Sequence, residues 1–479
     1  MRGAIAAGHP VTAEVGARVL RDGGNAIDAA VAACFASWVA ESPLTGAGGG
    51  GFMLIHRAGD RTTRLLDFFV AVPGGGVDPA AMDALDIDFS SGAVVPYHIG
   101  PASVAVPGVP LGLETAWRQF GSRPWAELIE PAIALAREGV EVTPTQAYLH
   151  ELLSGILLSR PEGRAIYSVK VGERIRIPQL ADTLQVLADE GAAALYTGDL
   201  ARALCETAPH VSPDDLAGYR VIRRRPVSAG FRGFELRSNP PPSSGGILIA
   251  YGLRLLERWN RSDPRAIVDA MREQAAAREG AFLRALYRGG LARRLIGPDA
   301  PTMTTHISTV DARGDAVAVS CSTGSGSGVF IPGTGIQLNN MLGEVDLAGL
   351  HKPGQRLTSM MAPTICLADG RPRLVVGSAG SARLRGAIFQ IVVRVLARAE
   401  GVRDAVDAPR LHWDEGIVHA EGGWPAEDID SFEGAGFPVT RWPRKDLFFG
   451  GAQAVELLED GTLAAAGDPR RGGAGIVVE

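Results

Sequence analysis

The sequence predicts an α+β protein in which helices enclose sheets. Apolar residues recur with helical spacing over much of the chain before residue 285, whereas polar and apolar residues alternate as in strands from Thr304 onward. Between these regions, residues 287–303 are polar and interrupted by glycine and proline, a composition typical of an exposed linker. The secondary structure therefore changes immediately after a linker that ends before Thr304.

The N-terminal part is expected to begin with two helices. Thr12 can cap the first helix, which breaks at the polar stretch 22–25. Asn25 can cap the second helix, over residues 26–39, which is apolar nearly all round and therefore belongs in a core. A glycine loop follows, and the short apolar run 52–55 after it is expected to be a strand.

Further elements follow in the same mixed pattern. Helices are expected over much of residues 114–210, and NPPPSSGG at 239–246 is expected to be a loop because proline removes backbone donors. Residues 306–322 alternate, turn and alternate again, which predicts a β-hairpin. Other strands are expected at 362–367, 373–377 and 454–458, and a buried helix at 386–399.

Composition argues against several classes of function. The formal net charge is −6 and hydrophobic residues make up 46%, so no nucleic-acid or membrane partner is expected. No uncharged apolar stretch of about 20 residues and no signal peptide is visible, so we expect a cytoplasmic protein. The four cysteines and nine histidines lack metal-binding spacing, and neither a metal nor another cofactor is expected.

The glycine loop at 46–51 contains GxGxxG, which can mark a dinucleotide site. That fingerprint requires a strand before it and a helix after it. Here the expected helix precedes the loop and the expected strand follows it. Close packing of the backbone is therefore the preferred interpretation.

Thr304 opens the stretch TTHISTV, directly after the linker. A threonine hydroxyl is a weak nucleophile unless a base lies beside it, and an N-terminal threonine can use its own α-amine. A free α-amine has a pKa of about 7.7–8.0, so part of it is neutral near pH 7. The hypothesis requires a cut between Met303 and Thr304, which the Thr304 hydroxyl can make by attacking the Met303 carbonyl. His306, within a strand, is expected to be a packed, hydrogen-bonded side chain rather than a base.

Ten segments in order resemble the γ-glutamyltranspeptidase family of N-terminal-nucleophile hydrolases. They are GNAIDAAVA (24–32), SPLTGAGGGGFML (42–54), SVAVPG (103–108), LYTGDLA (195–201), NPPPSSGG (239–246), TTHISTVDARGDAVAVS (304–320), GIQLNNMLGE (335–344), SMMAPTI (359–365), GSAGSAR (377–383) and DAPRLH (407–412). The resemblance implies a four-layer αββα sandwich cut into a large subunit, 1–303, and a small subunit, 304–479. A homodimer of such heterodimers is one assembly that it allows.

The resemblance also assigns roles within the site. Thr304 would be both the self-cleaving residue and the catalytic nucleophile, and Ser322 would assist it. Backbone amides of Gly380 and Ser381 would form the oxyanion hole, which is worth about 3–4 kcal/mol per donor in one hydrolase. The positions expected to contact the substrate are Gly324, Asn340, Glu344, Ser359 and Met360.

The substrate-binding set departs from the family pattern. The family's arginine for the substrate α-carboxylate is missing from DFFVAVPGGGVD at 67–78, and neither Arg61 nor Arg64 upstream is placed at the site by the sequence. Glu344 stands where aspartate is usual, Met360 replaces the second of two serines, and Gly324 replaces an asparagine. The loss of a charge-assisted contact to carboxylate weakens the expectation of a γ-glutamyl substrate.

The sequence therefore predicts a self-processing amidohydrolase or acyltransferase that acts on a small-molecule amide through an acyl-Thr304 ester. A γ-glutamyl amide is the first substrate hypothesis, and glutathione follows from the family name alone. An acylase of the glutaryl or cephalosporin type is an alternative. A further alternative is an unprocessed chain that serves as a scaffold or binding protein.

Overall fold

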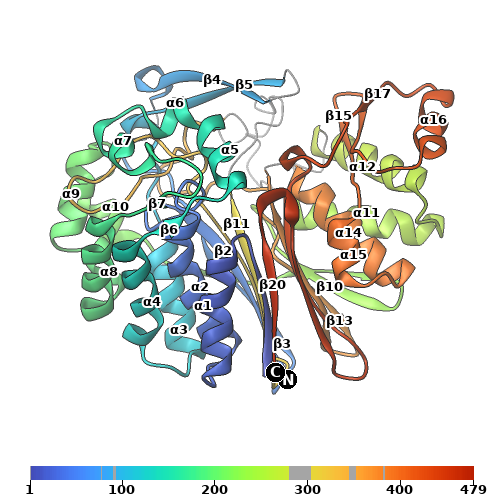
Figure 1. Ribbon diagram of the computed structural model, residues 1–479, viewed down its shortest axis with the longest axis horizontal. Helices are drawn as coiled ribbons and strands as arrows, with labels where there is room; N and C mark the ends of the chain where they lie inside the picture. The colour runs from blue at the N-terminus through green and yellow to red at the C-terminus, as the bar shows by residue number, and fades with distance from the viewer. Residues whose placement is uncertain (1, 77, 90–92, 280–303, 345–351, 381–382) are drawn as a thin grey trace.

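The computed structural model describes residues 2–76, 78–89, 93–279, 304–344, 352–380 and 383–479. The linker at 287–303, with Met303, and Ser381 lie outside these residues. In the described part, two large antiparallel sheets stand next to each other, with helices on the outer side of each (Figure 1). The two chain ends meet in one sheet, because Gly3 pairs with Val478.

The first sheet contains seven strands in the described part of the chain, in the order β20-β1-β11-β12-β2-β3-β8. The strands are β1 (Gly3–Ala7), β2 (Gly50–Arg57), β3 (Thr62–Phe68), β8 (Ile222–Arg224), β11 (Thr305–Asp311), β12 (Ala316–Ser322) and β20 (Ala474–Val478). Its centre is the hairpin of β11 and β12, which confirms the hairpin expected at 306–322. β1 and β2 flank this hairpin, so two strands from the N-terminal part of the chain help to hold it in place.

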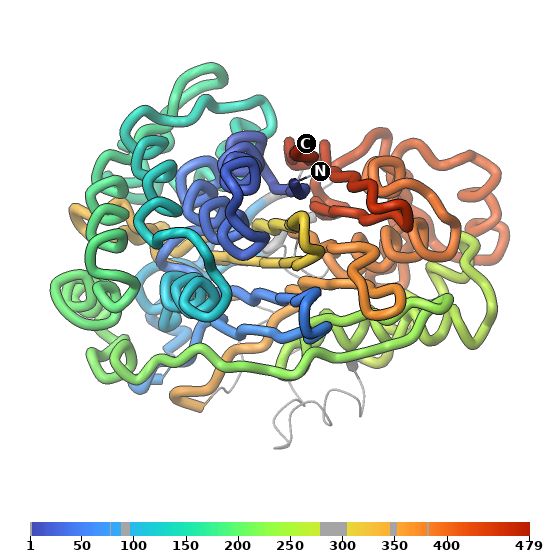
Figure 2. Tube along the Cα trace, turned by 90° about the horizontal axis from the view of Figure 1, so that it is seen from below, coloured from blue at the N-terminus to red at the C-terminus, as the bar shows by residue number. Residues whose placement is uncertain are grey.

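The second sheet has the order β19-β18-β14-β13-β10-β9. Its strands are β9 (Val227–Phe231), β10 (Phe234–Ser238), β13 (Thr364–Ala368), β14 (Arg371–Ala379), β18 (Gly451–Leu457) and β19 (Leu463–Gly467). β13, β14 and β18 confirm the three later strands expected from the sequence. Figure 2 shows the chain from below, with the two termini close together.

The helices α1 (Pro10–Arg21) and α2 (Ala26–Ala40) cover the outer face of the first sheet. Asn25 caps α2 through hydrogen bonds from the amides of Ile27 and Asp28, as expected. The expectation that Thr12 caps α1 is wrong, because His9 accepts the capping bond from the Val11 amide. Proline is favoured in the first turn of a helix, and Pro10 starts α1 before Thr12.

On the second sheet, the outer helices include α11 (Gly245–Trp259) and α14 (Arg383–Arg398), and α14 is the buried helix expected at 386–399. The loop expected at 239–246 ends earlier than predicted, since α11 begins at Gly245. A side chain at Gly246 would place its Cβ 2.3 Å from the carbonyl oxygen of Asn239. The glycine therefore allows the loop to return close to the helix start.

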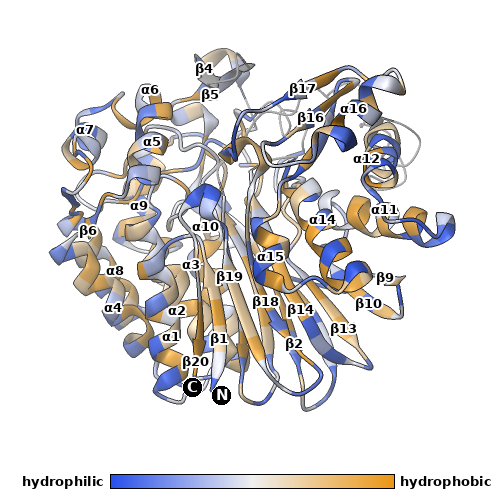
Figure 3. Ribbon diagram, turned by 45° about the vertical axis from the view of Figure 1, so that its right-hand side comes forward, coloured by the Kyte–Doolittle hydropathy of each residue, from blue (hydrophilic) through white to orange (hydrophobic). Residues whose placement is uncertain are grey.

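The inner faces of the two sheets share one apolar cluster. Ala4 and Val310 of the first sheet belong to it together with Val375 and Val455 of the second. Hydrophobic residues run along the strands of both sheets in Figure 3. Such burial is the main favourable contribution to folding, at roughly 25 cal/mol per Å² of apolar surface.

Smaller elements surround this centre. They are α3 (Val109–Phe120), α4 (Trp125–Glu138), α5 (Pro144–Leu152), α6 (Ser154–Leu157), α7 (Pro161–Tyr167), α8 (Pro178–Glu190), α9 (Asp199–Thr207), α10 (Pro213–Gly218), α12 (Pro264–Glu279), α15 (Val402–Asp407) and α16 (Ala426–Gly434). The short strands are β4 (Asp83–Phe89), β5 (Ala93–Ile99), β6 (Val140–Glu141), β7 (Arg174–Ile175), β15 (Leu411–Asp414), β16 (Ile417–Ala420) and β17 (Val439–Arg441). The 3₁₀ turns are η1 (Pro79–Ala81), η2 (Pro101–Ser103), η3 (Ala192–Leu195), η4 (Leu447–Phe449) and η5 (Pro469–Arg471). None of the helices in the described part is long and apolar enough to cross a bilayer.

Candidate active site

Thr304 directly precedes β11 and lies opposite the end of β12. In the antiparallel register, Thr305 pairs with Cys321 and Ile307 pairs with Val319. One further step of the same register places Thr304 opposite Ser322. Both side chains are almost completely buried, with 1% of each residue exposed. The hairpin therefore brings together two of the residues predicted to be catalytic.

Side chains along β11 point alternately to the two faces of the sheet. Thr305 points toward the helical layer, where its hydroxyl donates to Glu41. His306 points toward the second sheet, where a Cβ at Gly377 would lie 2.2 Å from the imidazole Cε1. By this alternation Thr304 shares the face of His306, and it lines the same pocket as Ala379, the last residue of β14.

Gly380 follows β14 and precedes α14, with φ of 117°. An added Cβ would lie 2.9 Å from the Cα of Gly450, so the two backbones approach each other closely. Glycine is suited to this position because L side chains rarely adopt such a φ value. Gly380 is thus at the edge of the pocket that contains Thr304, whereas Ser381, its predicted partner in the oxyanion hole, lies outside the described residues.

Three of the predicted substrate-binding residues lie together beside Ser322. The Ser322 hydroxyl accepts a 2.8 Å hydrogen bond from the amide of Gly324. A Cβ at Gly324 would lie 2.1 Å from Asn340 Oδ1 and 2.5 Å from Glu344 Oε1. Glu344 is 1% exposed. The structure therefore brings Gly324, Asn340 and Glu344 into one cluster.

Ser359 and Met360 are held by a different segment. The Ser359 carbonyl accepts from the amide of Ser244, and its hydroxyl accepts from the amide of Met361. The Met360 sulfur accepts from the Ser244 hydroxyl at 2.9 Å. Within the described residues, no hydrogen bond joins either residue to Thr304. The structure thus ties this pair to the loop before α11 and not directly to the nucleophile.

The first half of the segment without the family's arginine, residues 67–72, lies in the core. Phe69 is 1% exposed and stacks on Phe52, with ring centroids 5.2 Å apart. Neither of the upstream arginines lines the pocket that contains Thr304. Arg64 is half exposed, lies 3.9 Å from Asp60 and is above the Phe120 ring. Residues 67–72 therefore supply no cation to the site.

Glu41, which sequence reasoning missed, lies immediately beneath the hairpin start. It directly follows α2 and is 6% exposed. The hydroxyls of Thr305 and Thr12 donate to its two oxygens at 2.5 and 2.9 Å. A carboxylate directly after a helix that is apolar apart from Asp28 and Ser37 is the one signal in the sequence that points to it.

Burial raises the pKa of Glu41 to about 7. The hydrogen bonds from Thr305 and Thr12 and the positive charge of Arg471 act in the opposite direction. Desolvation dominates because a carboxylate loses its hydration when it is buried. Glu41 therefore titrates near neutral pH. It is hydrogen-bonded to Thr305, the residue that directly follows the predicted nucleophile.

His306 is not available as a base. Its Nδ1 and Nε2 lie 2.8 and 3.0 Å from the hydroxyls of Ser320 and Ser308. Burial lowers the pKa of His306 to about 3, so the imidazole is neutral at physiological pH. The prediction of a packed, hydrogen-bonded histidine is confirmed.

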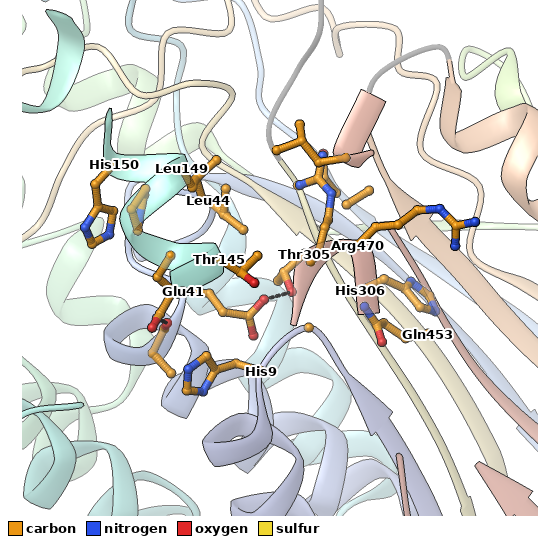
Figure 4. A pocket seen from close by; sticks show the side chains of 18 residues that line it. His9, Glu41, Leu44, Thr145, Leu149, His150, Thr305, His306, Gln453 and Arg470 are labelled. Carbon is orange, nitrogen blue, oxygen red and sulfur yellow. Dashed lines mark hydrogen bonds between the residues drawn. The ribbon is translucent and has the colours of Figure 1, made fainter. Parts of the chain in front are cut away.

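A pocket with about 590 Å³ of empty space, part of it open to solvent, lies above the start of β11 (Figure 4). Its walls come from the end of α2, from α5, from the start of β11 and from the loop that contains η5. The residues that line it include Gly8, His9, Glu41, Leu44, Thr145, Leu149, His150, Thr304, Thr305, Ala379, Gln453, Arg470 and Arg471. The predicted nucleophile is therefore accessible from a pocket with both acidic and basic groups.

Buried ion pairs hold one wall of this pocket. Arg470 lies 2.5 Å from Glu421 and 3.1 Å from Asp468, and its side chain is 0% exposed. Asp468 also pairs with the buried Arg410 at 2.5 Å. Charges that are buried this completely require close partners. The loop at 468–471 is thus fixed where it meets the site.

The chain is similar to a protein family, to characterised enzymes and to solved structures. Residues 12–285 and 293–478 match the family model described as gamma-glutamyltranspeptidase. The glutathione hydrolase proenzyme of Bacillus subtilis is 28% identical, over 99% of this chain and 91% of that protein. The acylase ACY 1 proenzyme of a Pseudomonas strain, SE83, is 31% identical, over 100% and 94%. A crystal structure of cephalosporin acylase from Bacillus halodurans shares the fold, with a TM-score of 0.85, 24% identity and coverage of 100% and 96%.

Proposed function

Because the chain belongs to the gamma-glutamyltranspeptidase family, we propose that it is a self-processing amidohydrolase or acyltransferase with Thr304 as its nucleophile. The observation that carries the proposal is the placement of Thr304. It is buried directly before β11, one register step beyond the pair of Thr305 and Cys321 and so opposite Ser322, and it lines the same pocket as the end of β14.

Self-processing would begin at the bond before Thr304. The Thr304 hydroxyl attacks the Met303 carbonyl, the peptide nitrogen leaves, and an ester forms. Water then hydrolyses this ester and frees the Thr304 α-amine. The products are a large subunit, 1–303, and a small subunit, 304–479. The name proenzyme, given to the relatives, supports the existence of a precursor.

Catalysis would use the groups that this cut creates. The α-amine takes the hydroxyl proton while the Thr304 oxygen attacks the amide carbonyl of the substrate. The backbone amides of Gly380 and Ser381 stabilise the oxyanion, and Ser322 assists the nucleophile. The amine leaves with a proton from the α-ammonium group. Water or an acceptor amine then releases the acyl group from Thr304.

The proposed architecture is the four-layer αββα sandwich of N-terminal-nucleophile hydrolases. Its support is the shared apolar cluster between the two sheets, with α1 and α2 outside one sheet and α11 and α14 outside the other. The hairpin of Thr304 then lies in an inner layer. Its first residues reach the end of the sandwich where the pocket opens.

The substrate is proposed to be a small amide whose acyl group is γ-glutamyl or similar to it. In this proposal Glu344 and Asn340 contact the donor, with Gly324, Ser359 and Met360 forming the rest of its binding site. A glutaryl-type acylase is a second candidate. The lack of an arginine in residues 67–72, where the buried Phe69 lies, favours the acylase, because no guanidinium group from this segment can bind the carboxylate of an amino acid.

The function can be tested by release of p-nitroaniline from γ-glutamyl-p-nitroanilide and glutaryl-p-nitroanilide. Wild type should turn over at least one of them, and Thr304→Ala should turn over neither. Thr304→Ser, which keeps a hydroxyl, should retain part of the activity. Equal turnover by wild type and Thr304→Ala would overturn the proposal. Equal or better turnover of the glutaryl compound by wild type would favour the acylase over the γ-glutamyl enzyme.

A further inference from the structure

Arg471 reaches the edge of the predicted oxyanion hole. Arg471 is the last residue of η5. Its side chain passes directly over Gly451, where an added Cβ would lie 2.2 Å from Arg471 Cδ. Its Nη2 lies 3.5 Å from the position of a Cβ at Gly380. Arg471 and Thr304 line the same pocket. The guanidinium group is thus close to the place where the substrate carbonyl would react.

The side chain of Arg471 has no hydrogen-bonding partner among the described residues, in contrast to that of its neighbour Arg470. Its Nε is buried and has no hydrogen-bond partner there, and no carboxylate lies within ion-pair distance of its guanidinium group in that part of the chain. Arg470, one residue earlier, makes ion pairs with Glu421 and Asp468. Buried donors in folded proteins are nearly always paired. The five donors of a guanidinium group therefore remain available for a ligand.

The charges around Arg471 leave it positive at neutral pH. Burial lowers its pKa to about 10, with Asp468 and Glu41 opposing this shift and Arg383 and Arg410 adding to it. Arginine at this pKa stays protonated at pH 7. The pocket that Arg471 lines therefore contains its positive charge at every pH near neutral.

The other ionisable groups of the pocket are less able to bind an anion. Burial lowers the pKa of His9, and it lowers the pKa of His150 to about 4, so both are neutral at pH 7. Glu41 already accepts hydrogen bonds from two threonine hydroxyls. Arg470 is engaged by its two carboxylates. Arg471 is thus the cation of this pocket that has capacity for a new partner.

We propose that Arg471 binds a carboxylate group of the amide substrate beside Thr304 and thereby determines specificity. The proposal rests on the proposed function and adds a substrate class, namely amides that carry a carboxylate. A guanidinium group matches the two oxygens of a carboxylate with two parallel hydrogen bonds. This location differs from residues 67–78, where the family's arginine is absent.

The carboxylate can belong to either side of the scissile amide. On the acyl side it is the far end of a dicarboxylic chain such as glutaryl. On the amine side it is a carboxylate of the leaving group or of the acceptor. Both present the same chemistry to Arg471, so substrates that differ on one side only are needed to distinguish them.

The test compares selectivity ratios within each variant, because a ratio is independent of the fraction of folded enzyme. The acyl arm is kcat/KM for glutaryl-p-nitroanilide divided by that for pentanoyl-p-nitroanilide. The amine arm is kcat/KM for glutaryl-3-carboxy-4-nitroanilide divided by that for glutaryl-p-nitroanilide. Arg471→Gln should reduce one ratio by about 10- to 100-fold, the usual effect of a lost charge-assisted hydrogen bond. Arg471→Lys should lie between it and wild type.

The control is Arg64→Gln, an exposed arginine outside the pocket, which should leave both ratios unchanged. A binding measurement separates this proposal from the proposed function. Calorimetry should show that wild type binds glutarate or 5-amino-2-nitrobenzoate at least tenfold more tightly than Arg471→Gln, even if neither chain turns over an anilide. Unchanged ratios in Arg471→Gln, or equal affinity of both chains for both anions, would overturn the role of Arg471.

Discussion

The hydroxyl of Thr305 donates a 2.5 Å hydrogen bond to Oε2 of Glu41, across 264 residues of sequence. A Cβ at Gly8 would lie 2.2 Å from the same oxygen, so the absence of a side chain at this glycine, directly after β1, leaves room for the carboxylate. The first residue of β11 is therefore joined to the end of α2. Because Thr304 precedes this residue directly, Glu41 helps to fix the backbone that carries the proposed nucleophile.

Glu41→Gln should change the pH dependence of stability. The pKa of Glu41 is raised from 4.5 to about 7 in the folded chain, so the folded state retains a proton that the unfolded state loses between these values. Stability from this group is present below pH 4.5 and is lost as pH rises through 7. Between pH 5 and 8, wild type should lose about 2–3 kcal/mol more unfolding free energy than Glu41→Gln. Urea unfolding at both pH values measures this difference.

The same titration with Glu14→Gln provides the control, because Glu14 is an exposed carboxylate on α1. Glu14→Gln should follow the wild-type pH dependence. If Glu41→Gln also followed it, Glu41 would not titrate near neutral pH in the folded chain.

His306→Asn should lower stability without changing the pH profile of turnover. The neutral imidazole is hydrogen-bonded to Ser320 and Ser308 within a buried layer. Loss of these contacts and of the ring volume should cost about 2–4 kcal/mol. The apparent pKa values of kcat/KM should stay within experimental error of wild type. Loss of one limb of the profile would identify His306 as a catalytic base and contradict the structure.

Gly324→Asn, which restores the family's residue, should destabilise this chain. Gly324 has φ of 73°, and an added Cβ would approach Asn340 Oδ1 to 2.1 Å. Overpacking of this kind costs about 1–3 kcal/mol in addition to the backbone strain. Gly333→Asn is the matched control, because Gly333 has φ of 74° and nothing within 4 Å of its added Cβ. Thermal melting that showed equal losses for the two variants would rule out a steric clash at Gly324.

Glu421→Gln should destabilise the loop that carries Arg470. The substitution removes the charge that pairs with a fully buried guanidinium group at 2.5 Å. Breaking a buried ion pair from one side costs about 3–5 kcal/mol. Asp430→Asn, which breaks an exposed pair with Arg441, should cost less than about 1 kcal/mol. Chemical unfolding of both variants measures the contrast, and similar small losses would mean that the buried pair contributes little.

Local patterns predicted the parts of the fold that local sequence determines. Alternation of residues 306–322 identified the hairpin, and the side chain of Asn25 identified the start of α2. The loop glycines were assigned less well, since β2 begins at Gly50 and not at Phe52. A Cβ at Gly50 would lie 2.6 Å from the amide nitrogen of Val70, a long-range contact that no local pattern contains.

The residues of the candidate site likewise fall into those that the sequence identified and those that only the structure identified. Motif resemblance named Gly324, Asn340 and Glu344, which the structure brings together beside Ser322. It did not name Glu41 or Arg471, because their importance arises only when α2 and the C-terminal loop meet at the start of β11. The pairing of Gly3 with Val478, which joins the two ends of the chain, likewise lies beyond any local pattern.

The most direct test of the account is the intact mass of the purified chain under denaturing conditions, for wild type and Thr304→Ala. The account predicts two wild-type fragments, 1–303 and 304–479, and an uncut Thr304→Ala chain. Arg64→Gln should be cut as wild type is, which shows that substitution alone does not block processing. A wild-type chain that stays whole, or a Thr304→Ala chain that is cut at the same bond, would contradict the role of Thr304 as a self-activating N-terminal nucleophile.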